Sequence, residues 1–454
     1  MIARSARGRR MLLAPAIVAL TALAACGNSS TGGNGSAATL TGACAKYQPY
    51  AGHSGTTVTM FASIVSPESD SLQKSWAEFT QCTGIKVSYE GSNDFESQLP
   101  VRVSGGNAPD FAIIPQPGLL QQMVKTGKVA KPDSQTVANE DKNWTKVWKN
   151  YGSVNGTFYA APMSANMKSL VWYSPKAFAS AGYKVPGTWA DLMSLSGTIA
   201  SSASGGGKPW CGGIGSGTAT GWPATDWLEE VVLGKYGGDV YDKWVSHDIK
   251  FSSPQIQDSM KIVAGWMLNP AWVNGGFGDV KSIATTTFQS AGTPILTGKC
   301  SMLQQASFYE AQWPQGTNVG PNGDVFAFKL PAAGSITTPV EGGGEFVTAF
   351  SSRPEVKAVQ EYLSTSDWAT SRIKVAHGWV SANQGVDKNA YTDPIDQISA
   401  KYLTDPKATF RFDASDLMPA AVGAGQEWKS FTAWFAEGQS VQQVASDIDA
   451  AWPS

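Results

Sequence analysis

Residues 56–64, "TTVTMFASI", are rich in β-branched and apolar side chains and end in small polar ones, which predicts a β-strand. The next segment, "SLQKSWAEFTQCTG" at 71–84, has helical periodicity and closes on a glycine. Two more strand-like segments, "IKVSYEGS" at 85–92 and "DFAIIPQPG" at 110–118, are each followed by a helical one. This series predicts a parallel sheet covered by helices, with ligand sites beyond the carboxyl ends of the strands.

A second αβ region follows the first. The strand-like segment "KSLVWYS" at 168–174 precedes several helical patterns, and the tail of the chain is mostly helical. We therefore expect an α/β protein of two lobes, with three crossovers near residues 165, 322 and 390. The first lobe is predicted over residues 56–165 plus 322–390, and the second over 166–321 plus 391–454.

The N-terminus has the pattern of an export signal. Four arginines within the first ten residues precede an apolar stretch at 11–23, and the sequence Leu23-Ala24-Ala25-Cys26 is typical of a bacterial lipobox. We predict a lipoprotein signal peptide over 1–26, with lipidation of Cys26, and a flexible tether over 27–55. The alternative is a plain secretory signal that is cleaved after Ala24 or Ala25.

The remaining cysteines predict disulfides. An even number, four, is left in an oxidising compartment, and no C-x-x-C spacing suggests a metal or redox site. Three pairings are possible. We favour Cys44–Cys82 and Cys211–Cys300, because each pair then lies within one expected lobe.

Composition excludes some classes of partner. The 34 basic and 36 acidic residues are mixed along the chain and give a net charge of −2. No basic face is expected, so nucleic acid is not a predicted partner. The chain is instead rich in tryptophan, with 17, and in glycine, with 48, which indicates many loops and flat aromatic faces.

Motifs for catalysis and phosphate binding are missing from the sequence. The three histidines, His53, His247 and His377, lie outside any H-E-x-x-H or C-x-x-C context, and we expect no metal and no cofactor. The stretch "GGIGSGTATGWPATDW" at 212–227 lacks the spacing of a nucleophile elbow, a dinucleotide loop or a P-loop. Carboxylate pairs for glycoside hydrolysis depend on spatial separation, so a secreted carbohydrate-active hydrolase stays open as an alternative.

The end of the same stretch favours a sugar ligand. An aromatic ring matches the C–H face of a pyranose, and a carboxylate pairs with neighbouring hydroxyls. Trp222 and Asp226 supply this combination within "GWPATDW". The structural alternative places Trp222 in the core at a helix entry, with Thr225 or Asp226 as the cap. A second tryptophan, Trp227, lies in an apolar helical pattern and is expected in the core.

Several segments together resemble the extracellular solute-binding proteins of sugar ABC transporters, particularly the α-glucoside-binding branch. The resemblance covers essentially the whole mature chain. It rests on "GNAPDFAIIPQPG" (106–118), "YAAPMSANMKSLVWYSPKAF" (159–178), "PGTWADLMSL" (186–195), "KPWCGGIGSGTATGWPATDWLEE" (208–230) and "RFDASDLMPAAVG" (411–423).

The resemblance implies a periplasmic-binding-protein-like fold of type II, a Venus flytrap that closes by hinge motion. It implies a protein that catalyses nothing, binds a small oligosaccharide such as trehalose, sucrose or maltose, and delivers it to ABC permease subunits with a cytoplasmic ATPase. With the lipobox, it implies a monomer anchored by lipid on the extracytoplasmic face of the cell membrane. A lectin-like sugar-binding module is a further alternative.

Candidate ligand-binding residues follow from the loops after the strands, from the crossovers and from this resemblance. Structural alternatives are a helix N-terminus for Glu68, a turn or cap for Asp110, and the core for Trp428. Arg411 and Asp413 are expected to form a structural ion pair. The predicted substrate-binding residues are Ser63, Glu68, Asn93, Asp110, Gln116, Asn166, Trp222, Asp226, Gly342, Gly343, Gly344, Trp379 and Trp428.

Overall fold

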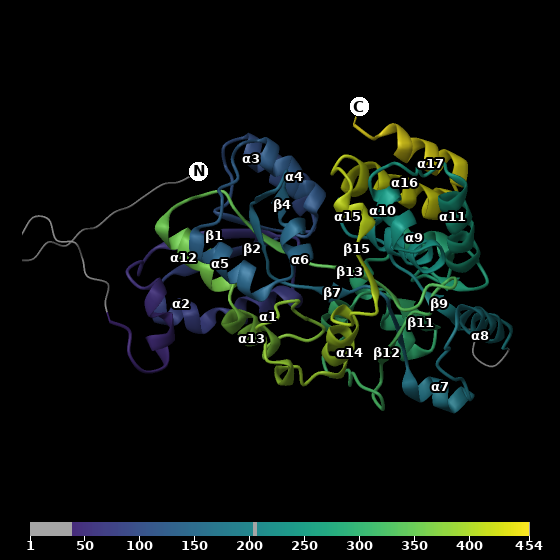
Figure 1. Ribbon diagram of the computed structural model, residues 1–454. Coiled ribbons are helices and arrows are strands. Elements are labelled where there is room, and N and C mark those ends of the chain that lie inside the picture. Colours follow the sequence, from purple (N-terminus) through teal and green to yellow (C-terminus); the bar gives the residue numbers. More distant parts are fainter. Residues whose placement is uncertain (1–38, 203–206, 454) are drawn as a thin grey trace, which may run out of the picture. The chain divides into compact units, whose positions relative to one another are not determined.

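Two five-stranded sheets organise the computed structural model, which describes residues 39–202 and 207–453 (Figure 1). The first sheet has the order β2-β1-β3-β14-β6, in which β1 pairs in parallel with β2 and β3, and β14 runs antiparallel. The predicted parallel β-α-β start is therefore confirmed. The strands are β1 (Thr57–Ala62), β2 (Lys86–Gly91), β3 (Phe111–Ile114), β6 (Ala160–Pro162) and β14 (Phe346–Ala349).

Helices pack against the strands of this first sheet and complete the first lobe. Their apolar side chains form one continuous core with the strands, in which Phe61, Phe79 and Phe95 are fully buried. Pro100 does not interrupt its helix, which continues to Ser104. The helices are η1 (Gly42–Tyr50), α1 (Glu68–Ser75), α2 (Ala77–Thr83), α3 (Phe95–Ser104), α4 (Pro117–Lys125), α5 (Ser134–Asn143), α6 (Lys146–Tyr151), α12 (Pro354–Leu363) and α13 (Ser366–Ile373).

The second sheet has the order β10-β9-β11-β8-β12 and supports the second lobe. Its strands are β8 (Leu170–Tyr173), β9 (Lys208–Cys211), β10 (Val273–Asn274), β11 (Cys300–Gln304) and β12 (Phe326–Lys329). The predicted boundary at residue 322 groups β12 with the first lobe, whereas β12 pairs with β8 along its whole length. The strand β12 pairs with β8 and forms the edge of the second sheet, so β12 belongs to the second lobe.

The central helix of the second lobe is α9, which is buried along nearly its whole length and contacts α10, α11, α15 and α16. Two helices of this lobe have π-helical geometry, η7 (Val422–Glu427) and η8 (Ala433–Glu437). The others are α7 (Pro175–Ala181), α8 (Trp189–Ser201), α9 (Trp222–Tyr236), α10 (Gly238–Val245), α11 (Pro254–Met267), η2 (Val280–Ala284), η3 (Phe288–Ser290), η4 (Thr293–Thr297), η5 (Ser307–Gln312), α15 (Ala414–Leu417), α16 (Trp428–Thr432) and α17 (Val441–Ala450).

A short third sheet lies where the chain passes between the lobes. It has the order β15-β13-β7, with β7 (Asn166–Met167), β13 (Pro339–Gly343) and β15 (Thr409–Phe412), and α14 (Pro394–Leu403) packs on it. The chain crosses between the two main sheets over residues 163–169 and 330–345, and it leaves the first lobe a third time over residues 374–393, between α13 and α14, which gives the three predicted crossovers. The remaining elements are the hairpin β4 (Ser153–Val154) and β5 (Thr157–Phe158), and η6 (Lys388–Ala390).

Both favoured disulfides are present, Cys44–Cys82 and Cys211–Cys300. The Cys44–Cys82 disulfide shows that the predicted tether over residues 27–55 extends too far. Residues 42–50 form η1 and are cross-linked to α2. Tyr47 and Tyr50 are buried against Phe79 and Tyr362, so this part of the predicted tether belongs to the core of the first lobe.

The predicted signal peptide and the lipidation site Cys26 lie outside the described residues. Within the described residues, no helix has both the length and the apolar character that crossing a bilayer requires.

Candidate functional site

A cavity lies between the two lobes, at the carboxyl ends of the first three strands. Ser63 follows β1, Asn93 follows β2 and Gln116 follows β3, as the topology predicts for a parallel sheet. The second lobe closes the cavity from the opposite side. Its lining residues are Ser63, Ile64, Glu68, Asn93, Glu96, Pro115, Gln116, Asn166, Lys168, Ser216, Ala219, Trp222, Phe288, Phe308, Gly343, Gly344, Glu345, Asp413, Asp416 and Trp428.

The side of the cavity formed by the first lobe is polar, and we call it the polar wall: Ser63, Glu68, Asn93, Glu96, Gln116 and Glu345. Gln116 Nε2 donates a hydrogen bond to Glu96 Oε1 at 3.2 Å. Glu96 Oε2 and Gln116 Oε1 are buried but have no hydrogen-bond partner in the protein. Buried polar atoms are normally paired, so these two oxygens are available to a ligand.

Carboxyl groups on the polar wall titrate above their ordinary range. Burial raises the pKa of Glu96 to about 7. Burial also raises the pKa of Glu345 to about 8, and the neighbouring Glu68 adds to this shift. The pKa of Glu68 is raised by burial too, while the Arg372 guanidinium opposes the shift. A protonated carboxyl can donate as well as accept, which suits the mixed hydrogen-bonding needs of hydroxyl groups.

The side formed by the second lobe is aromatic, and we call it the aromatic wall: Trp222, Phe288, Phe308 and Trp428. The Trp222 ring lies 5.1 Å from Phe288 and 6.1 Å from Phe308, measured between ring centroids. Trp428 is almost fully buried, and its Nε1 has no hydrogen-bond partner in the protein. Three half-buried rings and one buried indole therefore present apolar faces opposite the polar wall.

Local sequence explains why Trp222 reaches the cavity. Helix α9 begins at Trp222 because Gly221, at a φ of 114°, reverses the chain and Pro223 fits the first turn. A Cβ at residue 221 would lie 2.2 Å from the Trp428 carbonyl oxygen, so only glycine allows this close approach. The indole is thereby fixed at the exposed end of an otherwise buried helix.

Lys168 forms the floor of the cavity between the two walls. Its Nζ lies 2.7 Å from Asp226 Oδ1 and also contacts Asp413 Oδ2, and it lies 5.2 Å from the Trp222 ring centroid. Burial alone would lower the pKa of Lys168, but Asp226 and Asp413 raise it well above its usual value. We call Lys168, Asp226 and Asp413 the floor cluster.

The two carboxylates of the floor cluster titrate differently. Burial raises the pKa of Asp226 to about 7, although Lys168 opposes the shift. Burial would also raise the pKa of Asp413, but Lys168 and hydrogen bonds from Asp416 N and Ser415 Oγ hold it below its usual value. Of the two carboxylates, Asp413 is therefore the one that the Lys168 ammonium holds in its charged form.

A loop of the second lobe reaches the first lobe beside the cavity. Thr218 N donates to Asp94 Oδ1 at 3.2 Å, next to Asn93. Gly217, at a φ of 57°, passes so close that a Cβ there would lie 2.7 Å from the Asn93 carbonyl oxygen. The glycine-rich stretch thus works as a backbone loop that meets the opposite lobe, and not as a phosphate cradle.

Most predicted site residues line this cavity. Gly343 N donates to Asn166 Oδ1 at 3.2 Å, which places the third sheet at the back of the cavity. A Cβ at Gly344 would lie 2.4 Å from the Ser164 carbonyl oxygen, so glycine is needed there for close packing. The predicted residues found in the lining are Ser63, Glu68, Asn93, Gln116, Asn166, Trp222, Gly343, Gly344 and Trp428.

Four predicted residues are not in the lining. Asp110 lies at the opposite, amino end of β3, where it accepts hydrogen bonds from Thr59 and pairs with Arg353 at 2.7 Å. Asp226 lies behind Lys168, because it falls on the inward face of α9 and not at its cap. Gly342 sits inside the third sheet between β7 and β15, and Trp379 packs against Trp368 in the first core.

Other side chains of the site do not appear among the predicted residues, notably Lys168, Glu96, Phe288 and Phe308. Lys168, the lone lysine within the mostly apolar stretch 160–173, was a usable signal, because a buried lysine needs carboxylate partners. The expected Arg411–Asp413 pair is wrong: Arg411 pairs with Asp242 at 2.6 Å, and Asp413 pairs with Lys168. Trp227 lies in the core, as predicted.

Comparisons with known proteins agree with this architecture. Residues 65–376 match the family model of the bacterial extracellular solute-binding proteins. The osmoprotective compounds-binding protein GgtB of Synechocystis is 33% identical over 87% of this chain and 92% of its own length. The α-glucosides-binding periplasmic protein AglE of Rhizobium meliloti is 32% identical over 88% of each chain.

Solved structures share the fold. The bacterial solute receptor AcbH, described as preferring β-D-galactopyranose, superposes with a TM-score of 0.75 over 88% of this chain and 98% of its own, at 17% identity. The predicted two-lobed periplasmic-binding-protein fold of type II is therefore confirmed.

The chain belongs to the bacterial extracellular solute-binding proteins. Within that class it is a substrate-binding protein of the ABC-transporter kind, which works outside the cytoplasm and is not an enzyme, as predicted.

Proposed function

We propose that this protein captures a small oligosaccharide, an α-glucoside such as trehalose, sucrose or maltose, and delivers it to an ABC import permease driven by a cytoplasmic ATPase. In this proposal the protein is a monomer anchored by a lipid on Cys26 at the extracytoplasmic face of the membrane. The observation that carries the sugar assignment is the pairing of the two walls across one cavity.

The chemistry of the walls is that of a carbohydrate site. The rings of the aromatic wall match the C–H faces of a pyranose, and the oxygens of the polar wall match its hydroxyl groups. Glu96 Oε2 and Gln116 Oε1, buried and unpaired in the protein, would gain hydrogen bonds from hydroxyls on closure. Because the walls come from different lobes, only a closed cleft lets a sugar contact both, and this differential affinity drives closure.

The relatives support a sugar and, more narrowly, an α-glucoside. GgtB and AglE are named for osmoprotective compounds and for α-glucosides, and each is more than 30% identical to this chain over most of its length. The glycine-rich loop, Trp222 and the third-sheet glycines are the parts of this chain that would set the shape of the sugar subsite.

Calorimetric titration of the full chain, purified in detergent, tests this function. We expect trehalose, sucrose or maltose to bind with a Kd in the micromolar range, corresponding to about −8 kcal/mol. A sugar at about 100 times its Kd should stabilise the fold by about 2.7 kcal/mol and raise the melting temperature accordingly. If none of these glucosides gives heat or a melting shift while another oligosaccharide does, the α-glucoside is the wrong substrate. If no oligosaccharide does, the sugar assignment itself fails.

A further inference from the structure

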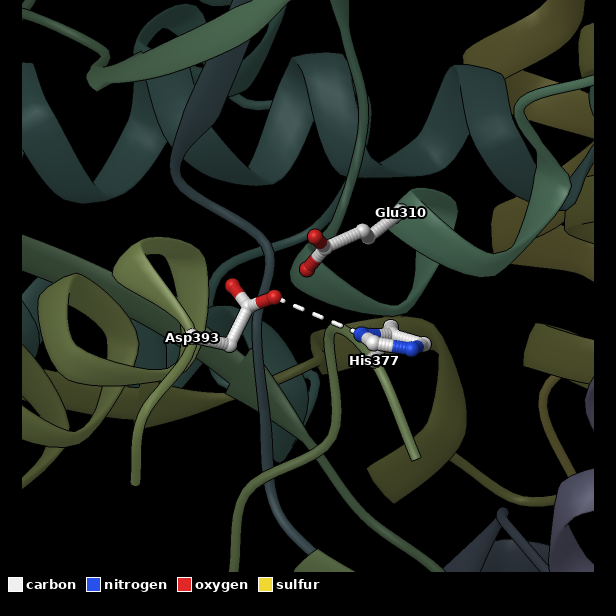
Figure 2. Close-up of side chains that lie close together, drawn as sticks. All are labelled: Glu310, His377 and Asp393. Atoms are coloured by element: carbon white, nitrogen blue, oxygen red, sulfur yellow. Dashed lines mark hydrogen bonds and ion pairs between the residues drawn. The ribbon is translucent and has the colours of Figure 1, made fainter. Parts of the chain in front are cut away.

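Three side chains far apart in the sequence meet at the third crossover. Glu310 lies on η5, His377 follows α13, and Asp393 is the N-cap residue of α14; Figure 2 shows their polar ends turned toward one another. One nitrogen or oxygen atom from each falls within 4.8 Å of the others. His377 Nδ1 lies 3.4 Å from Asp393 Oδ2. None of the three lines the cavity described above.

A second observation is that the Glu310 carboxyl group is buried and incompletely hydrogen-bonded. The residue is only 6% exposed, and its Oε2 is buried without a hydrogen-bond partner. No lysine or arginine in the described part of the chain forms an ion pair with Glu310 or Asp393. A buried carboxylate that faces another carboxylate and an imidazole, with no lysine or arginine paired to it, is a place where a bound cation would balance charge.

We propose that Glu310, His377 and Asp393 form a site for a first-row divalent transition metal, of which zinc is the representative. One imidazole nitrogen and two carboxylate oxygens are ligands that zinc accepts at three positions, leaving a fourth for water. The exposed His377 ring, 72% accessible at its side chain, would give the ion a path from solvent. The site is distinct from the floor cluster, where Lys168 already supplies the cation.

The metal would join segments that belong to different parts of the fold. His377 lies between Ala376 and Trp379, which are buried in the core of the first lobe. Glu310 and Asp393 lie beside Tyr309 and Ile395, which are buried between the second and third sheets. The same short helix η5 carries Phe308 of the aromatic wall. Bound zinc would therefore fasten the third crossover and hold the helix that presents Phe308.

Zinc titration of the full chain after removal of metals with a chelator tests the site. We expect one zinc ion per chain by calorimetry, and Co²⁺ in its place should give visible absorption bands of a low-symmetry nitrogen and oxygen site. His377→Asn and Glu310→Gln should each weaken zinc binding by at least about tenfold, the lower bound for loss of a supporting group at a metal site. His53→Gln, a change of a histidine outside the cluster, should leave binding unchanged.

The same variants also test whether a loss of zinc binding is caused by a loss of folding. Asp393→Asn retains an oxygen that can cap α14, and His377→Asn changes an exposed ring, so both should melt like the wild type without metal. The proposal is overturned if the wild-type chain binds no zinc in the micromolar range, as when Glu310 and Asp393 simply share a proton. It is equally overturned if His377→Asn and Glu310→Gln bind zinc as the wild type does, which would mark the bound metal as an adventitious ion only.

Discussion

The polar wall and the floor cluster both contain buried carboxyl groups, but they balance them differently. In the floor cluster, Lys168 lies within ion-pair distance of both Asp226 and Asp413, so the cluster contains a cation of its own. In the polar wall, Glu96 and Glu345 have no ion pair with a lysine or arginine among the described residues, and their pKa values are raised by burial.

This difference indicates that the floor cluster supports the structure of the site, whereas the polar wall is the part that would bind the ligand. The floor already contains its own cation, although Asp226 Oδ2 has no hydrogen-bond partner in the protein, and it fixes where the third sheet and α9 meet beneath the Trp222 ring. The polar wall keeps unpaired oxygens that face the cavity. A ligand therefore gains most from the polar wall, whose Glu96 and Glu345 carboxyl groups have no such ion pair, while the floor with its internal cation keeps the opposite wall in position.

Lys168→Met breaks the floor and should have the largest effect. It removes the ammonium and leaves two buried carboxylates without a cation, which costs about 3–5 kcal/mol of unfolding free energy. Urea denaturation followed by intrinsic fluorescence measures this loss. Sugar binding should weaken in the same variant, because Trp222 loses the cation that lies against its ring.

A matched triple variant separates charge from packing. Lys168→Met with Asp226→Asn and Asp413→Asn removes the positive and both negative groups together, so most of the lost stability should return. A Lys168→Met protein that is within 1 kcal/mol of the wild type would show that the floor carboxylates are not held by this ammonium.

Glu345→Gln tests the polar wall, where burial raises the pKa of a carboxyl group that has no ion pair with a lysine or arginine in the part of the chain that the structure describes. The pKa of Glu345 is raised from 4.5 to about 8, chiefly by burial, so between these values the folded chain holds a proton that the unfolded chain has released. This group therefore makes the protein less stable as the pH rises through that window. One pKa unit is worth about 1.4 kcal/mol, so from about pH 5 to about pH 8 the wild type should lose about 3 to 4 kcal/mol more than Glu345→Gln.

Melting temperature against pH measures this difference, and Glu437→Gln is the control, since Glu437 is exposed at the end of η8. Parallel pH curves for wild type and Glu345→Gln would mean that water reaches the Glu345 carboxyl and that burial does not hold its proton.

The alternation of strands and helices and the residues at the carboxyl ends of the strands could be predicted from sequence, and the cavity-lining character of Trp222 was predicted from one heptapeptide. Ser63, Asn93 and Gln116 follow their strands directly, so local pattern was enough to place them. The floor was not predictable in this way. Lys168, Asp226 and Asp413 come from three distant segments: the third sheet brings Lys168 beside Asp413, and α9, which packs on β13, adds Asp226.

Local pattern also failed where a residue lay at the other end of the same strand. Asp110 precedes β3 by one residue and Gln116 follows it by two, yet they lie on opposite edges of the sheet. Around β3, only residues after its carboxyl end reach the cavity. The Pro-Asp pair at 109–110 does not by itself show that Asp110 lies at the amino end of that strand. The π-helical turn that precedes Trp428 likewise has no sequence pattern that would separate a lining indole from a core one.

Trp222→Ala probes the aromatic wall and should have the smallest of these effects on stability, because the ring is only half-buried. Its effect on sugar affinity should be at least about tenfold, since stacking of a good aromatic contact contributes about 1.4 kcal/mol. Trp222→Phe keeps a flat ring and should lose less. Trp452→Ala is the matched control, because Trp452 stacks on His247 with ring centroids 4.0 Å apart and does not line the cavity. If Trp222→Ala binds sugar as tightly as Trp452→Ala does, the ring only shapes the cavity, and recognition rests on the polar wall alone.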